Sequence, residues 1–267
     1  MAGRMEGKSV VVVGAGQTPG ETIGNGRAIA VLFAREGAKV LCVDRVIERA
    51  HETAEQILGE EGEALAMAAD ITKAADCANI VSEAKARFGR IDALINNVGI
   101  GGGGDGPAHR LEEAAFDRIV DVNLKGMWLT IKAALPLMRE QGGGAIVNIS
   151  SLAAVAGGIQ LAYEVSKAGV NRLTTSVAQS NARYGVRCNA IMMGYIDTPM
   201  AVSGIARASG RPVAEVRAER DARVPLRGKM GTAWDTAYAT LFLASDEAAF
   251  ISGAILPVDG AMGTRIG

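Results

Sequence analysis

The sequence predicts a single α/β domain built on a doubly wound parallel sheet. Short, continuous apolar runs alternate along the chain with longer segments of helical periodicity. Strands buried on both faces give such unbroken runs, and the helices that follow them cover the two faces of the sheet. With 267 residues, 49% of them hydrophobic, and no linker or internal repeat, we expect residues 1–267 to form one unit.

The expected elements follow this alternation in order. Apolar runs predict strands at 9–13, 40–43, 94–95, 146–149 and 186–191, and a further strand ending at 69–72. Helical patterns occupy 27–35, 48–59, 74–88, 111–139 and 162–184. In such a sheet, ligands bind at the carboxyl ends of the strands, so the polar residues that follow each run are the candidates for a binding site.

Charge and cysteine usage exclude several classes of protein. The net charge is −1 and both signs are spread along the chain, which argues against a nucleic-acid or membrane-surface partner. Cys42, Cys77 and Cys188 are scattered, which indicates reduced thiols and a cytoplasmic protein. The uncharged stretch 141–163 contains five glycines and an asparagine, so we expect a buried strand and loop there, and no membrane span. The lone histidines His51 and His109 do not suggest a metal site.

A glycine-rich turn links the first expected strand to the first expected helix. It contains Gly14, Gly16, Gly24, Asn25 and Gly26. Free backbone N–H groups and the positive end of a helix dipole bind phosphate, and glycines allow a pyrophosphate to approach closely. The alternative is a flexible strand-to-helix loop without a ligand. Because a strand precedes the turn, we favour a dinucleotide site.

Asp44 closes the second expected strand, about 18 residues after the turn. A carboxylate there accepts hydrogen bonds from the adenosine ribose and repels a 2′-phosphate, which favours NAD(H) over NADP(H). Arg45 follows directly and could support a phosphate, so NADP(H) is not excluded. Asp70, at the end of the third strand, could meet the adenine amine or cap the next helix. Asn123, inside an expected helix, either faces solvent or has a function.

Tyr163 and Lys167 are the candidate proton-transfer pair. They lie four residues apart in an expected helix and therefore share one face, after a strand that ends in Ser150 and Ser151. Lowering the pKa of a tyrosine from ~10 to about 7 needs roughly 4 kcal/mol. A cation about 4 Å away supplies a contribution of that size, so we expect Lys167 to lower the pKa of Tyr163. The alternative is a core tyrosine followed by a solvated lysine.

In order and spacing, these motifs resemble the short-chain dehydrogenase/reductase family over essentially the whole chain. The resemblance rests on the turn 14–26, Asp44, Asp70-Ile71, the segment 96–99, Asn123, the Ser-Tyr-Lys set, the segment 189–199 and the closing strand within 251–260. It implies a Rossmann fold with a seven-stranded parallel sheet and helices on both faces. It also implies a homotetramer, with two-fold axes through the helices 111–139 and 162–184.

The resemblance implies a role for each matching residue. Tyr163 would be the general acid/base, Lys167 would lower its pKa and bind the nicotinamide ribose, and Asn123 would hold a water in a proton relay. The substrate-orienting serine would be Ser151 by the pattern N-I-x-S, or Ser150 by its distance from the tyrosine. We prefer Ser151, because a loop deletion costs less than a register change inside a buried strand.

The same resemblance implies a cofactor site and no metal ligand. The cofactor-binding residues would be Gly14, Gly16, Gly24, Asn25, Gly26, Asp44, Asp70, Ile71, Asn97, Val98, Gly99, Tyr163, Lys167, Gly194, Ile196 and Thr198.

The chain departs from the family pattern at three places. Seven residues, 17–23, separate Gly16 from Gly24 where the family has one, and this longer loop should lie near the pyrophosphate or adenosine. Val98 replaces an alanine, and Met193 replaces the proline before Gly194, which should place it near the substrate.

The segment 197–223 resembles the family's substrate lid and carries five arginines, at positions 207, 211, 217, 220 and 223. They could meet an anionic substrate, but a solvated helix face is the more common arrangement and is our expectation.

We therefore expect an oxidoreductase that transfers a hydride between NAD(H) and a secondary alcohol or ketone. One alternative is an NADP(H)-dependent carbonyl or 3-oxoacyl reductase. An alternative of another class is a dinucleotide-binding sensor or scaffold without turnover, which would have no need of both Tyr163 and Lys167.

Overall fold

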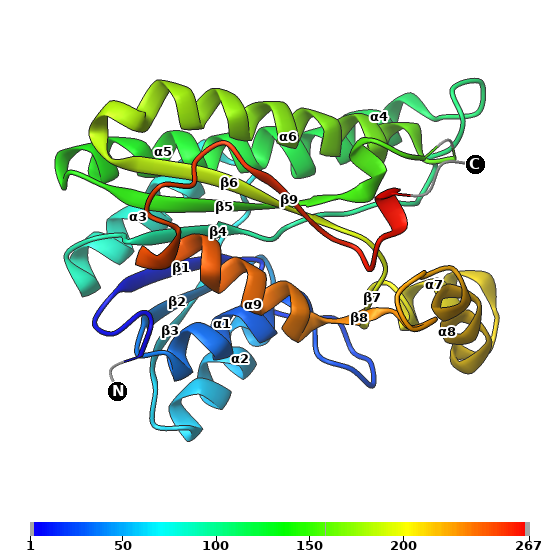
Figure 1. The fold of residues 1–267 in the computed structure, drawn as a ribbon, viewed down its shortest axis with the longest axis horizontal. Coiled ribbons are helices and arrows are strands. Elements are labelled where there is room, and N and C mark those ends of the chain that lie inside the picture. The colour runs from blue at the N-terminus through cyan, green and yellow to red at the C-terminus, as the bar shows by residue number, and fades with distance from the viewer. Residues whose placement is uncertain (1–2, 158, 265–267) are drawn as a thin grey trace.

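A seven-stranded parallel sheet forms the centre of the computed structural model, which describes residues 3–157 and 159–264 (Figure 1). The strands lie in the order β3-β2-β1-β4-β5-β6-β9. Their bounds are Ser9–Val13 (β1), Lys39–Asp44 (β2), Glu63–Ala68 (β3), Ala93–Asn96 (β4), Gly144–Ser151 (β5), Val186–Met193 (β6) and Ile255–Val258 (β9). The order reverses between β1 and β4, which is where doubly wound sheets bind their ligands.

Helices cover both faces of this sheet, as Figure 1 shows. One face carries α1 (Asn25–Arg35), α2 (Ile47–Gly59) and α9 (Ala233–Ala244). The other carries α3 (Ala74–Phe88), α4 (Glu113–Val120), α5 (Met127–Glu140) and α6 (Leu161–Asn181). The predicted doubly wound, single-domain α/β fold is therefore confirmed.

The continuous apolar run of β1 fills two separate cores. Val10 and Val12 pack into the cluster beneath α1 and α9, whereas Val11 and Val13 pack into the cluster beneath α3 and α5. Successive side chains of a strand point to opposite faces, so a strand covered on both sides must be apolar at every position. This is why the run is unbroken.

Buried polar side chains tie the central strands to the helices behind them. Asn96 of β4 donates to Asn148 of β5 at 2.9 Å and accepts from Thr130 of α5 at 2.7 Å. Asn148 donates to Thr174 of α6 at 3.0 Å. Because these amides find partners inside the core, their burial is tolerated, and they fix the position of the strand end that precedes Asn97.

The helix expected at 111–139 begins and ends close to the expected positions but is not uniform. Between α4 and α5 the chain forms a π-helical segment, Asp121–Gly126, that contains Asn123. Apolar periodicity cannot reveal one wider turn in a helix, and such turns occur frequently at functional sites.

The third strand ends earlier than expected, and Asp70 does not cap a helix. Strand β3 ends at Ala68, and the cap position of α3 is Lys73, without a side-chain cap hydrogen bond. Asp70 instead closes a local turn, because its carboxylate accepts from the backbone N–H of Thr72 at 3.1 Å and from its hydroxyl at 2.7 Å. Short polar side chains compete in this way with helix capping.

An excursion between β6 and α9 stands apart from the main sheet, at the right of Figure 1. The short strands β7 (Ile196–Asp197) and β8 (Gly231–Thr232) pair in parallel at its base. It contains α7 (Ser203–Ser209) and α8 (Val213–Ala222) and has a small core of its own, made of Val202, Ala206, Val216, Val224 and Met230. This excursion contains the predicted lid, 197–223.

The three cysteines are free and buried. Over the ranges 3–157 and 159–264, no group of His, Cys, Asp and Glu is arranged to hold a metal ion. No helix in those ranges is both long enough and apolar enough to span a bilayer.

Candidate functional site

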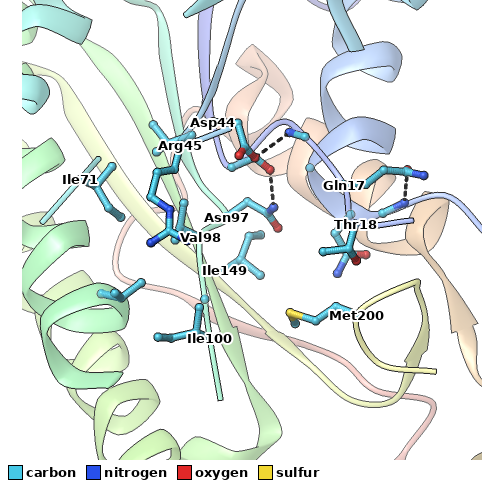
Figure 2. Close-up of a pocket in the computed structure, with 18 of the residues that line it drawn as sticks. Gln17, Thr18, Asp44, Arg45, Ile71, Asn97, Val98, Ile100, Ile149 and Met200 are labelled. Atoms are coloured by element: carbon cyan, nitrogen blue, oxygen red, sulfur yellow. Dashed lines mark hydrogen bonds between the residues drawn. The ribbon is translucent and has the colours of Figure 1, made fainter. Parts of the chain in front are cut away.

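A cleft of about 430 Å³ opens at the carboxyl ends of the central strands. Figure 2 shows it, with Asp44 and Gln17 on one side and Ile100 and Met200 on the other. All of the residues expected to bind a cofactor line this cleft, except Gly194 and Ile196. Ile196 is buried in β7, and Gly194 packs against Asp259. Sequence positions from 13 to 200 therefore converge on one site.

At three positions of the first turn, the backbone conformation or the closeness of neighbouring atoms allows only glycine. Gly14 has a φ of +83°, which L side chains rarely adopt. A Cβ atom on Gly26 would lie 1.8 Å from the carbonyl oxygen of Gly14, and one on Gly16 would lie 2.7 Å from Asp44 Oδ2. No larger residue fits at these positions, so the turn presents bare backbone along the cleft, as a dinucleotide pyrophosphate requires.

Backbone N–H groups on two sides hold the Asp44 carboxylate in place at the end of β2. Its Oδ2 accepts from Gly16 at 3.2 Å and its Oδ1 accepts from Val46 at 2.9 Å. Arg45 forms no ion pair with Asp44, and in Figure 2 its side chain runs along the wall of the cleft toward Val98. Hydrogen bonding from Thr72 lowers the pKa of Asp70, and the charges of Lys73 and Arg45 act in the same direction.

The longer loop 17–23 crosses from the cofactor turn to the excursion. Gln17 closes its base by accepting from the Gly24 backbone at 2.9 Å, a bond that Figure 2 shows. At its far end, Gly20 packs so tightly on Pro199 that a Cβ atom would lie 2.7 Å from the proline. The loop therefore lies at the edge of the cleft and also touches the excursion, a contact that spacing alone did not predict.

One ion-pair network joins this loop to α8. Arg217 of α8 binds Glu21 at 3.1 Å and Asp197 of β7 at 2.9 Å. Glu21 and Arg217 are 196 residues apart in the sequence, so no local pattern could have indicated the pairing.

Lys167 is buried against strand β5. Its ammonium donates to the carbonyl oxygen of Ile149 at 2.9 Å, and the residue is only 3% exposed. Burial lowers the pKa of Lys167 to about 8. The ammonium lies 5.7 Å from the centre of the Tyr163 ring, so the two side chains share one wall of the cleft, as their spacing predicted.

The expected effect of Lys167 on the phenol is not found. Burial raises the pKa of Tyr163, and a hydrogen bond with Ser151 and the charge of Arg220 oppose this rise only in part. Lys167 is not among the groups that shift this pKa in the structure, so its lowering of the phenol pKa stays a prediction. The ammonium is held by the Ile149 carbonyl of β5, and the phenol is desolvated, which disfavours its charged form.

The two serines at the end of β5 point in opposite directions. Ser150 is fully buried and its hydroxyl donates to the backbone carbonyl of Lys167 at 3.3 Å. Ser151 is partly exposed, accepts from the Ala153 backbone at 3.2 Å and bonds with Tyr163. Strand alternation separates them, and only Ser151 faces the phenol.

Asn123 is buried and does not face solvent. Its Oδ1 accepts from the Ile100 backbone at 2.8 Å, and its Nδ2 donates to the Ile100 carbonyl at 2.9 Å and to Ser166 at 3.1 Å. Asn123 therefore links the loop after β4 to helix α6. Both hydrogens of its amide are engaged in these bonds.

Asp105, in the loop that follows β4, has a role that the sequence did not reveal. Its carboxylate accepts from the backbone N–H groups of Ala162 at 3.0 Å and Tyr163 at 3.1 Å. These are N–H groups of the first turn of α6, which lack partners within the helix, so Asp105 anchors the helix that carries the phenol. The only local signal was an acidic residue directly after the glycine run 101–104.

Met193 lines the cleft, as its place beside Gly194 suggested. Its sulfur accepts weak hydrogen bonds from Asn25 at 3.3 Å and from Thr236 at 3.5 Å. It thus connects the end of β6 to the start of α1, although the expected contact with substrate is not tested.

The lid arginines lie in three different environments. Arg207, Arg211 and Arg223 are exposed, as a solvated helix face predicts. Arg217 is held by the carboxylates described above. Arg220 departs from the expectation, because it is half-buried, lies 3.9 Å over the ring of Tyr195 and has a buried Nε without a hydrogen-bond partner.

Comparison with known proteins identifies the family. Residues 21–262 match the family model described as enoyl-(acyl carrier protein) reductase. Cis-4-hydroxycyclohexanecarboxylate dehydrogenase of Sinomonas cyclohexanicum is 40% identical over 242 residues, covering 90% of this chain and 93% of that protein. Levodione reductase of Leifsonia aquatica is 35% identical over 260 residues, covering 96% and 94%.

A solved short-chain dehydrogenase/reductase from Mycobacterium marinum superposes with a TM-score of 0.84 at 28% identity, over 97% of this chain and 96% of that one. The chain is an oxidoreductase that belongs to the short-chain dehydrogenase/reductase family.

Proposed function

We propose that this protein transfers a hydride between NAD(H) and a secondary alcohol or ketone, with Tyr163 as the general acid/base. The observation that carries the proposal is the shared cleft. Tyr163 and Lys167 line one part of the cleft, and the glycine turn and Asp44 line another part of the same cleft. A dinucleotide bound along the turn would therefore bring its reactive ring to the phenol.

The residues present fit such a cofactor. The turn formed by Gly14, Gly16 and Gly26 would hold the pyrophosphate, Asp44 would accept from the adenosine ribose, and Lys167 would donate to the nicotinamide ribose. When bound, the nicotinamide supplies the hydride chemistry and, in its oxidised form, a positive charge. These assignments are supported by the absence of room for a Cβ atom at the three glycines.

Tyr163 would exchange the proton with the substrate oxygen. Because burial raises the pKa of Tyr163, the phenol is protonated at neutral pH and suited to donate a proton to a carbonyl oxygen. Ser151 would hold the same oxygen from the other side. Its partly exposed hydroxyl beside the phenol favours Ser151 over the buried Ser150 for this role.

Asn123 would act mainly by positioning. Its amide holds Ile100 and Ser166 on either side of the site, so neither of its N–H hydrogens is left to bind a relay water. The proton relay expected from the family resemblance stays a prediction.

Cofactor choice depends on Asp44. Its carboxylate is fixed by two backbone N–H groups, so it cannot easily turn away from a 2′-phosphate, and like charges at this distance cost several kcal/mol. NADP(H) is the second candidate, because Arg45 and Arg49 both line the same part of the cleft. For the substrate, the names of the relatives support an alcohol or ketone. A 3-oxoacyl-[acyl-carrier-protein] reductase of Thermotoga maritima, 33% identical, supports the alternative of an acyl substrate.

The test is a screen of secondary alcohols, cyclic diols and ketones with each nicotinamide, read by the absorbance of the reduced ring. Tyr163→Phe should lower kcat by at least ~10²-fold while cofactor affinity stays nearly unchanged. The exposed Tyr238→Phe on α9 is the control and should retain full activity. A Tyr163→Phe enzyme with near-normal kcat would contradict the mechanism. Cofactor binding without turnover of any substrate would favour the sensor alternative.

A further inference from the structure

Two segments that are remote in the sequence meet at the edge of the cleft. Thr18, from the loop 17–23, and Met200, from the excursion, both line the cleft, and Figure 2 labels both. Farther along the loop, a Cβ atom on Gly20 would lie only 2.7 Å from the Cβ atom of Pro199. We call the loop 17–23, together with the part of the excursion that it contacts, residues 197–217, the strap.

An ion pair joins the two parts of the strap. Arg217 of α8 donates to Glu21 at 3.1 Å and to Asp197 at 2.9 Å, so one guanidinium ties the loop to the base of the excursion. The side chains of Glu21 and Arg217 are 68% and 30% exposed. An exposed ion pair is weak, so this contact can open and close without leaving a buried charge unpaired.

The two parts of the strap are attached to the rest of the protein in a way that lets them separate. The loop contains no helix or strand, and its base is fixed by the bond between Gln17 and the Gly24 backbone. The excursion begins at the two-residue strand pair β7 and β8, and its small core is separate from the two cores beneath the main sheet. A segment with its own core can shift as a unit, so the strap can open while the glycine turn stays in place.

We propose that Arg217 is a positioning residue for the cofactor, which binds Glu21 to hold the strap closed and must release it before the dinucleotide dissociates. The inference rests on the proposed function, because the dinucleotide is expected along the glycine turn from which the loop starts. Gln17 and Met200 line the same cleft, so a dinucleotide that fills the cleft contacts both parts of the strap. Opening of such a lid commonly limits the rate at which a bound molecule leaves.

The experiment measures the dissociation rates of NADH and of NADPH by stopped flow, from the fluorescence of the reduced nicotinamide after mixing each complex with an excess of its oxidised form. Glu21→Gln removes the charge of the loop and leaves the bond between Arg217 and Asp197 intact. It should raise the dissociation rate by roughly 2- to 5-fold, as expected for the loss of one exposed ion pair. Glu219→Gln is the matched control, because Glu219 pairs with two arginines of the excursion itself, and it should release the cofactor at the wild-type rate.

A second variant opens the strap without changing a charge. Gly20→Ala adds the Cβ atom that would overlap the rigid ring of Pro199, so it should speed release at least as much as Glu21→Gln does. Gly59→Ala is the control, because a Cβ atom there would meet no atom within 4 Å, and it should leave the rate unchanged. Raising NaCl from about 0.05 M to about 0.5 M should accelerate release from the wild type more than from Glu21→Gln, because salt screens the exposed pair.

Hydrogen exchange of the cofactor-free protein tests the strap by a readout that needs no cofactor. The backbone amides of residues 17–23 should exchange faster in Glu21→Gln than in the wild type, because the loop loses one of its contacts with the excursion. The same amides should exchange at the wild-type rate in Glu219→Gln. Unchanged exchange in Glu21→Gln would overturn the inference.

The dissociation rates separate this inference from the proposed function. If Glu21→Gln and the wild type release the cofactor at the same rate, or if Glu219→Gln accelerates release equally, the inference fails while the proposed function stands. If neither NADH nor NADPH binds to the wild type, both fail.

Discussion

Replacing Lys167 by methionine should alter the pH dependence of folding stability as well as remove activity. Lys167 is almost fully buried, and burial lowers its pKa from 10.5 to about 8. This difference corresponds to about 3 kcal/mol by which a protonated Lys167 destabilises the folded state. The hydrogen bond to the Ile149 carbonyl offsets part of this cost, by about 1 kcal/mol.

The sign follows from proton counts in the two states. Between its folded pKa of about 8 and its unfolded pKa of 10.5, Lys167 has released its proton in the folded protein but keeps it in the unfolded chain. The unfolded state then binds more protons, so the free energy of unfolding of the wild type rises with pH across this window. Methionine has no proton to release. The wild type should therefore gain about 2–3 kcal/mol relative to Lys167→Met between about pH 7 and about pH 10.

The assay is urea unfolding of both proteins at one concentration over this pH range, followed by circular dichroism. Only the difference between the two proteins is interpreted, because other titrating groups cancel in it. Lys132→Met, at an exposed position of α5, is the control, and its difference from the wild type should stay constant with pH. A constant difference for Lys167→Met as well would refute the reasoning, because the ammonium would then be as well solvated as in the unfolded chain.

Three further predictions test other parts of the site. Wild-type kcat/KM should favour NAD over NADP by roughly two orders of magnitude. Asp44→Ser should reduce this preference, mainly by raising kcat/KM with NADP. Equal use of both cofactors by the wild type would contradict the assignment. Asp105→Ala should lower the free energy of unfolding, measured by urea titration, by about 1–2 kcal/mol, because two N–H groups of α6 lose their acceptor. The control is Asp117→Ala on the exposed face of α4, which should have no effect in the same titration. The exposed Phe116, Trp128 and Val165 on α4, α5 and α6 should be covered in a homotetramer, and light scattering that shows a stable monomer at micromolar concentration would exclude it.

The elements of the fold could be predicted from the sequence because their signals are local. An unbroken run such as 9–13 is required when both faces of a strand are covered, and the spacing of Tyr163 and Lys167 places them on one helix face whatever surrounds them. Glycines at positions 14, 16 and 26 likewise reflect a backbone approach that no larger residue permits. These features depend on a few neighbouring residues, so they can be predicted from the sequence alone.

What the site does with those residues was decided by contacts between distant segments. The ammonium of Lys167 binds the Ile149 carbonyl, and desolvation, not a neighbouring cation, dominates the phenol. Asp105 reaches α6 across more than fifty residues, and Arg217 of α8 pairs with Glu21 of the loop after the first strand. Electrostatic effects depend on burial and on distances of a few ångströms. The sequence therefore determined which groups could take part, and the tertiary structure determined their charge, their partners and their orientation.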